Sequence, residues 1–168
     1  MTIAVSTETV VEVYNPLDVI EEIVIANEWP HDRSSDDEMI VEISGRWCEY
    51  RLLFIWQEDI GALHFSCSFD LKVPKARRHA IYELLASVNE KMWLGHFDIC
   101  SNSSLPMFRH ALTLRGTSGL SSEQVEDLVD SAVTESERFY PAFQLVIWGG
   151  KTAEEAMAAA MIEPVGEA

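Results

Sequence analysis

The stretch EMIVEISGRWCEYRLLFIWQEDIGALHFSCSFD, residues 38–70, decides the fold. Hydrophobic and polar residues alternate within it in three runs, over residues 38–43, 47–56 and 63–70. A period of two is typical of strands that bury one face. The connections between the runs are short, and short connections join antiparallel neighbours. The stretch therefore predicts a three-stranded antiparallel meander.

The register of the second and third strands depends on the turn between them, at residues 57–61. If this turn sets Phe54 opposite Leu63, Tyr50 lies opposite Cys67. Cys67 and Cys48 then both lie on the buried face, where thiols behave as small inert hydrophobes.

The outward face of the second strand is the first candidate binding surface. Trp47 is out of phase with the apolar residues of its own strand and in phase with Glu49 and Arg51. Trp and Arg are favoured at the energetic centres of protein interfaces. Leu53 and Ile55 lie farther along the same face. Either a partner protein binds this face, or a helix of the same chain covers it.

Helices surround the meander, and several of their ends carry recognisable signals. Asn15 and Pro16 suit the start of the first helix, and Ser121 with Gln124 forms a capping box at the start of the long one. Pro141 falls inside the long helix and is expected to kink it. The predicted helices cover residues 15–29, 73–95, 121–150 and 152–161.

Two more strands are predicted at residues 96–102 and 107–115, and residues 31–37 are predicted to be a polar loop. The element order is α-β-β-β-α-β-β-α-α. This order indicates an α+β fold, with an antiparallel sheet of about five strands flanked by helices. One domain is expected over residues 1–168, with a folded core at about 15–162 and flexible termini. Residues 9–14 alternate and are suited to a short extra strand.

The charge of the chain excludes some classes of partner. Twelve Lys and Arg against 28 Asp and Glu give 12 − 28 = −16. Such a field repels phosphate backbones and anionic membranes, so we expect neither nucleic acid nor membrane as a partner. Three cysteines without a CxxC pair argue against a disulfide framework, and the first residues lack a basic signal-peptide region. A cytoplasmic location is expected.

The sequence lacks residues with the spacing that a catalytic, cofactor-binding or metal-binding motif requires. His96, Asp98 and Cys100 share one side of a predicted strand, but three such positions span about 13 Å, too far for one ion. No Gly-x-Ser-x-Gly nucleophile motif occurs, and residues 116–119 lack both the Walker lysine and the GxGxxG spacing. We therefore predict no catalytic, cofactor-binding or metal-binding residues and no enzymatic activity.

A basic cluster stands out in this acidic chain. It comprises Lys75, Arg77, Arg78 and His79, at the start of the second predicted helix. The helix dipole disfavours cations there, so a compensating group is expected. The acidic face of the long helix is one candidate, in the same chain or in a second copy, and a solvated face without a partner is the alternative. Arg77 and Arg78 are therefore partner-binding candidates.

Tryptophans other than Trp47 are expected to lie mostly in the core. The group comprises Trp29, Trp56, Trp93 and Trp148.

Five stretches are distinctive, and they lie at residues 45–51, 61–65, 89–98, 137–143 and 148–151. They resemble the YbjN-like family of bacterial sensory transduction regulators, in particular its alphaproteobacterial branch, and the resemblance covers about residues 15–162. It implies a fold similar to that of the type III secretion chaperones, which are usually dimers that bind extended effector segments. It transfers no active-site residues.

Two functions follow as hypotheses. The first is a non-enzymatic, homodimeric protein-binding module, a chaperone-like or regulatory adaptor in signalling or stress response. The alternative is a small-molecule sensor with a pocket between sheet and helices, which the aromatic-rich sheet permits. An enzyme ranks third, with Cys100 as its least settled residue.

Overall fold

The computed structural model describes residues 14–161 and has an α+β architecture, which confirms the predicted class. Its helices are α1 (Pro16–Ala26), α2 (Arg78–Asn89), α3 (Ser122–Ile147) and α4 (Ala153–Ala160), with short 3₁₀ turns η1 (Glu58–Ile60) and η2 (Lys75–Arg77). Its strands are β1 (His31–Ser35), β2 (Glu38–Ser44), β3 (Glu49–Gln57), β4 (Ala62–Phe69), β5 (His96–Ile99) and β6 (Pro106–Thr113). The short strand predicted at residues 9–14 falls almost entirely outside the described residues.

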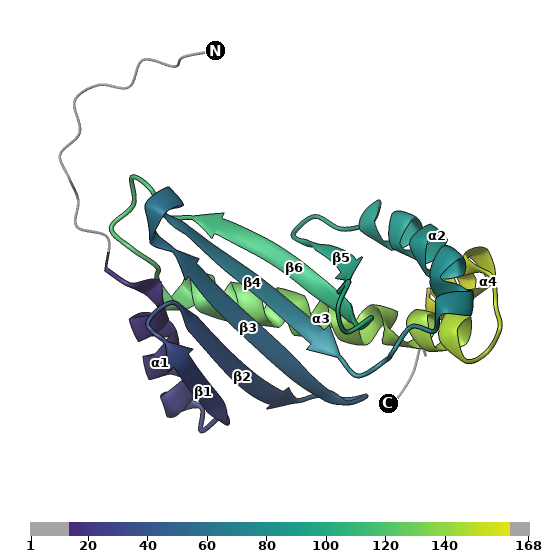
Figure 1. The fold of residues 1–168 in the computed structure, drawn as a ribbon, viewed down its shortest axis with the longest axis horizontal. Helices are drawn as coiled ribbons and strands as arrows, with labels where there is room; N and C mark the ends of the chain where they lie inside the picture. The colour runs from purple at the N-terminus through teal and green to yellow at the C-terminus, as the bar shows by residue number, and fades with distance from the viewer. Residues whose placement is uncertain (1–13, 162–168) are drawn as a thin grey trace, which may run out of the picture.

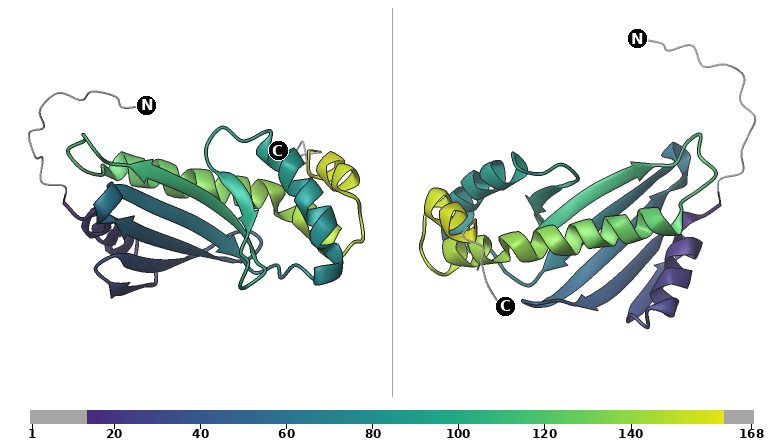
Figure 2. Two further views of the ribbon diagram at one scale, coloured as in Figure 1. Left: turned by 45° about the horizontal axis from the view of Figure 1, so that its top comes forward. Right: turned by 180° about the vertical axis from the view of Figure 1, so that it is seen from behind.

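The strands form one antiparallel sheet in the order β1-β2-β3-β4-β6-β5. Helices α1 and α3 lie on one face of it, and α2 and α4 gather at one end (Figure 1). Seen from behind, α3 crosses the sheet with α1 beside it (Figure 2). The core fills the space between α3 and the sheet, where rings such as Phe54, Phe65 and Phe143 are buried.

β1 corrects the prediction of a loop at residues 31–37 and makes six strands rather than five. Its residues are polar because it is an exposed edge strand, and backbone pairing with β2 holds it rather than hydrophobic burial. Arg33 adds ion pairs to α1, 2.9 Å to Asp18 and 2.6 Å to Glu21. Period-based reasoning misses such a strand because nothing in it is buried.

The predicted register between β3 and β4 is wrong by two residues. Phe54 pairs with Phe65 and Tyr50 with Phe69, because η1 and Gly61 lengthen the connection to residues 58–61, so that Gln57 pairs with Ala62. A shift of two preserves which face each side chain takes. Cys67 is therefore buried as expected, whereas Cys48 lies in the loop before β3 and is half-buried.

The helix ends match their capping signals. Asn15 accepts a bond from the Leu17 N–H, and the capping boxes at Ser121 and Thr152 are both formed. The first helix ends at Ala26, earlier than expected, and the second begins only at Arg78. The long helix continues through Pro141 to Ile147.

Candidate protein-binding surface

Trp47 lies in the loop between β2 and β3, and this loop folds onto α3. The Trp47 ring stacks on Tyr140, with centroids 5.9 Å apart and planes 3° from parallel, while the Arg46 guanidinium lies 4.9 Å from the centroid of the Trp47 ring. The prediction that Trp47 shares an outward face with Arg51 is wrong, because the alternation ends where β3 begins, at Glu49.

Glu137 of α3 holds this loop by accepting two hydrogen bonds. Its carboxylate accepts the Arg46 N–H at 2.6 Å, and its backbone carbonyl accepts the Trp47 indole N–H at 3.1 Å. In a regular helix that carbonyl accepts the N–H four residues later, but residue 141 is proline and has none. The loop thus satisfies the acceptor that Pro141 leaves open. It joins two of the stretches that carry the family resemblance.

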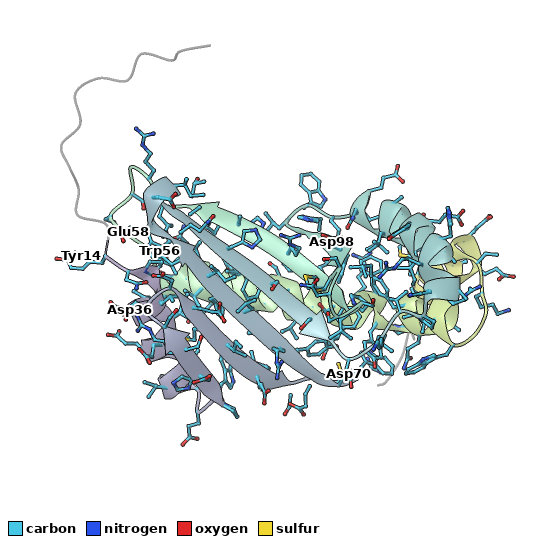
Figure 3. The ribbon with its side chains drawn as sticks, in the orientation of Figure 1. Tyr14, Asp36, Trp56, Glu58, Asp70 and Asp98 are labelled. Atoms are coloured by element: carbon cyan, nitrogen blue, oxygen red, sulfur yellow. The ribbon has the colours of Figure 1, made fainter. Side chains whose placement is uncertain are left out.

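Arg51, Leu53 and Ile55 lie on the sheet face opposite α3. This open face of the sheet is turned toward the viewer in Figure 1 and Figure 3, with α3 behind the sheet. Within residues 14–161 no helix covers it, so the half-buried Leu53 and Ile55 owe their cover to sheet neighbours. Arg51 pairs with Glu42 at 3.4 Å, and Asp98, labelled in Figure 3, pairs with Arg109 at 2.9 Å.

Arg77 and Arg78 hold the helical end of the molecule together. Arg77 donates to the backbone carbonyls of Val146 and Lys151, both at 2.7 Å, and Arg78 donates to the Ser104 hydroxyl at 2.9 Å. The Arg77 guanidinium therefore meets one carbonyl in the last turn of α3 and one in the connection to α4, rather than the acidic helix face proposed from the sequence. The six predicted partner-binding residues thus divide among three places.

A different surface has the features expected of a binding site. It begins at Trp93 and Leu94, in the connection between α2 and β5. Trp93 is 99% exposed and Leu94 is 54% exposed. Trp148 is also exposed, so the expectation that most tryptophans lie in the core is wrong. A fully exposed indole is unusual, since burial of a large aromatic ring stabilises a folded protein.

Gly95 directs this connection across the sheet edge. Its φ is +65°, and a Cβ there would lie 2.3 Å from the Phe108 ring and 2.7 Å from the Arg109 carbonyl oxygen. Only glycine meets both conditions without displacement. The turn brings Leu94 over the space between β6 and α3.

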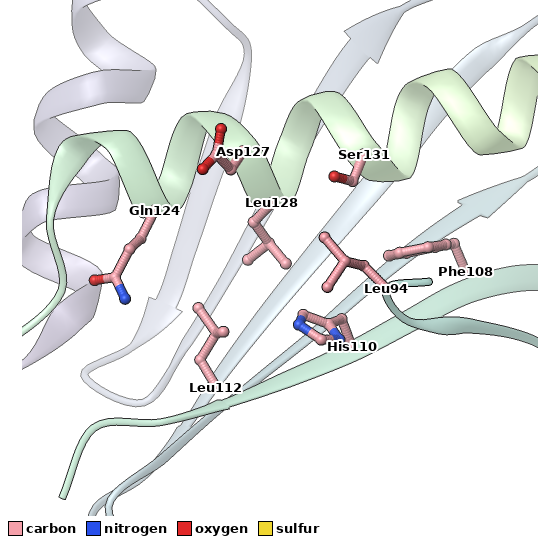
Figure 4. Close-up of a pocket in the computed structure, with 8 residues that line it drawn as sticks. All are labelled: Leu94, Phe108, His110, Leu112, Gln124, Asp127, Leu128 and Ser131. Atoms are coloured by element: carbon pink, nitrogen blue, oxygen red, sulfur yellow. The ribbon is translucent and has the colours of Figure 1, made fainter. Parts of the chain in front are cut away.

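Leu94 closes a groove of about 180 Å³ between β6 and α3. We call it the Leu94 groove. Figure 4 shows Leu94, Leu112 and Leu128 converging on it, with Asp127 at the helix side. Its full lining is Leu94, Phe108, His110, Leu112, Gln124, Asp127, Leu128 and Ser131. A second, more polar hollow continues along α3 and shares Leu94 and Ser131 with it; Trp93, Lys91 and Arg138 also line that hollow.

The chemistry of this surface suits recognition. Desolvation lowers the pKa of His110, with a further contribution from His96, so His110 is neutral near pH 7 and Asp127 is the one charged side chain of the Leu94 groove. Among the described residues, no group of three or more His, Cys, Asp or Glu side chains could hold a metal ion. None of the helices in residues 14–161 is long and apolar enough to cross a membrane.

The thiols differ sharply in environment. Burial raises the pKa of Cys67 to about 12, and its sulfur lies 3.9 Å from the Ser136 hydroxyl. Desolvation also raises the pKa of Cys48, whereas hydrogen bonds from Ser103 lower that of Cys100. Among the described residues, no side-chain base forms a hydrogen bond with the Cys100 thiol.

Sequence reasoning misses Trp93, Leu94 and the Leu94 groove. Residues 89–98 stand out in the sequence only as a family marker. The available signal is Gly95, which ends the predicted helix and so sets Trp93 and Leu94 beside a turn.

Comparisons with known proteins agree with this fold. The model of the YbjN family, described as "Putative bacterial sensory transduction regulator", matches residues 16–145. The crystal structure of E. coli YbjN, titled a putative transcription regulator, aligns with a TM-score of 0.52 at 10% identity, covering 83% of this chain and 95% of that one. No curated protein matches the chain in sequence. Because the family model covers more than half of the chain, the protein belongs to the YbjN family.

Proposed function

We propose that this YbjN-family protein is a non-enzymatic regulatory adaptor of the cytoplasm, which binds a partner protein over Trp93, Leu94 and the two hollows beside them. The observation that carries the proposal is the 99% exposure of Trp93 beside an apolar groove. Aromatic anchors next to apolar hollows are typical of interface centres. The side chain contributes little to the fold, so its apolar surface is available to a partner.

A small-molecule sensor is the weaker alternative. Ligand pockets usually enclose about 300–1,000 Å³ and are lined mainly by apolar side chains. The Leu94 groove is apolar but holds only about 180 Å³, and the neighbouring hollow holds about 530 Å³ but is lined mainly by polar and charged side chains. Direct contact with DNA is also disfavoured, for an electrostatic reason: a net charge of −16 opposes phosphate binding.

The experiment is site-specific photocrosslinking in the native cell. A photoreactive phenylalanine replaces Trp93 in one strain and Ile60 in another; Ile60 is 58% exposed, lies in η1 and lines neither hollow. We expect a discrete protein adduct from position 93 and none from position 60. Equal adducts from both positions, or none from either, would contradict the proposal.

A binding assay with the crosslinked partner completes the test. Trp93→Ala should weaken binding by about ten-fold or more, as truncation of an interface anchor does, while the free energy of unfolding stays within about 0.5 kcal/mol of wild type, as for exposed positions. Light scattering on the same variants measures the proposed homodimer. If Trp93→Ala also dissociates a dimer, the partner at this surface is a second copy.

A further inference from the structure

The edge of the sheet beside the Leu94 groove is only half paired. β5 pairs with β6 from Pro106 to Arg109 and no farther. From His110 to Thr113, β6 pairs with β4 on its inner side, and no strand within residues 14–161 pairs with its outer side. Alternate residues of this segment direct their backbone N–H and C=O groups outward. The open edge is about 13 Å long, four residues at 3.3 Å each.

The open edge exists because Gly95 turns the chain away. Residues before His96 would continue β5 along β6 if the strand were longer. Instead the positive φ of Gly95 carries Leu94 over the helix face. The open edge and the Leu94 groove are therefore parts of one feature, and both begin beside His96, the first residue of β5.

Side chains of an added strand would alternate between two environments. Residues paired with His110 and Leu112 would point to the α3 side, because paired residues of a sheet share a face. That side is the Leu94 groove, lined by leucines and Phe108. Residues paired with Ala111 and Thr113 would point to the open face, where both side chains are exposed.

The charge of this surface indicates which charge a bound extended segment should carry. Asp127 is the charged residue of the groove, Asp130 and Glu135 line the next hollow, and the whole chain carries −16. Lys91 and Arg138 also line that hollow, so its two carboxylates are balanced by two cations, of which Arg138 pairs with Glu135 at 3.4 Å. Asp127 and the net charge of the chain therefore favour a cationic segment over an acidic one.

We infer that the partner of the proposed function binds as an extended segment that adds a strand to β6 at residues 110–113, with alternate apolar side chains in the Leu94 groove and basic residues flanking them. This inference rests on the proposed function and specifies how the partner is held. Main-chain hydrogen bonds would supply pairing, and the groove would supply side-chain selection.

The test uses a synthetic probe, the fluorescein-labelled peptide Lys-Lys-Val-Thr-Val-Thr-Val-Lys-Lys. Valine and threonine N–H groups point to opposite edges of such a strand, so N-methylation of the valines or of the threonines blocks one edge each. Strand addition predicts that one methylated peptide binds like the parent and the other binds at least about ten-fold more weakly. Amide hydrogen exchange at residues 110–113 should slow when the parent peptide is bound.

Matched protein variants locate the site. Leu94→Ser should weaken binding of the parent peptide at least about ten-fold, and Ile60→Ser, at a similarly exposed aliphatic residue, should leave it unchanged. Equal effects of the two methylation patterns, or absence of binding at about 1 mM peptide, would overturn strand addition. A persisting adduct at position 93 in the cell would then show that the proposed function holds without it.

Discussion

Trp47 and Pro141 form a pair in which each residue accounts for the other. Pro141 removes the N–H that would normally bond to Glu137, and the Trp47 indole donates to that carbonyl instead. An acceptor left without its partner costs about 1 kcal/mol or more, less where water can reach it. Trp47 is 40% exposed, which places its contribution at the lower end.

Trp47→Phe keeps a ring for stacking on Tyr140 but removes the donor. We expect the free energy of unfolding to fall by about 1 kcal/mol. In a Pro141→Ala background, the new alanine supplies a backbone N–H that can bond to Glu137, so the same change should cost less. Urea denaturation of the four proteins in this double-mutant cycle measures the coupling. Strictly additive costs would show that the two residues are independent.

Single residues are the hardest to place from the sequence. Alternation extended past Glu49, where the strand begins, puts Trp47 on the outward face, although the residue lies in a loop. Residue type alone predicts that Trp93 lies in the core, yet its side chain is exposed in the turn that ends at Gly95. Residue type and period are local, whereas the position of a loop depends on a contact 90 residues away, such as that between Trp47 and Glu137.

At the scale of elements, the start of β5 depends on one glycine. Gly95→Ala must accommodate both a positive φ and a Cβ 2.7 Å from a backbone oxygen. Strain at a positive φ costs about 1 kcal/mol, and displacement of β5 from β6 adds to it. We expect the variant to lose about 2–4 kcal/mol of unfolding free energy, measured by chemical denaturation.

Gly116→Ala is the matched control for this change. Gly116 has φ +79° and nothing within 4 Å of the Cβ position, so its substitution carries the backbone strain without the collision. Its cost should stay near about 1 kcal/mol. If the two variants are equally destabilised, the close contact of Gly95 with β6 does not decide where β5 starts.

Helix ends are predictable because caps are local: the capping box expected at Ser121 forms, and Thr152 forms another at the start of α4. The meander is predictable because alternation reports burial directly. β1 cannot be predicted from hydrophobicity, because backbone pairing at a sheet edge needs no hydrophobic residues. The register between β3 and β4 differs from the prediction because it depends on the length of the η1 connection, which forms only when the two strands pair. The Leu94 groove escapes prediction for the same reason, since β6, α3 and the loop before β5 meet only in the folded chain.

At the scale of the whole molecule, the packed core sets the response to alkaline pH. Burial raises the pKa of the Cys67 thiol to about 12, against 9.0 for an unperturbed thiol, and raises the pKa values of Cys48, Tyr50 and Tyr140. Well below pH 9 the Cys67 thiol is protonated in both the folded and the unfolded state and does not alter stability. Above pH 9 the unfolded chain binds fewer protons than the folded one, so stability falls as pH rises.

We expect the free energy of unfolding, measured by urea denaturation, to decline from about pH 9 to about pH 10.5, with Cys67 contributing up to about 1.4 kcal/mol per pH unit. Cys67→Ala should lower stability at neutral pH but flatten this decline by up to about one proton. Cys100→Ala is the control: hydrogen bonds lower the pKa of Cys100, so this thiol does not retain its proton in the folded protein and cannot contribute to the decline. Its removal should therefore not flatten the decline above pH 9. An equal slope in Cys67→Ala and wild type would mean that water reaches the thiol and that the core between α3 and β4 opens readily.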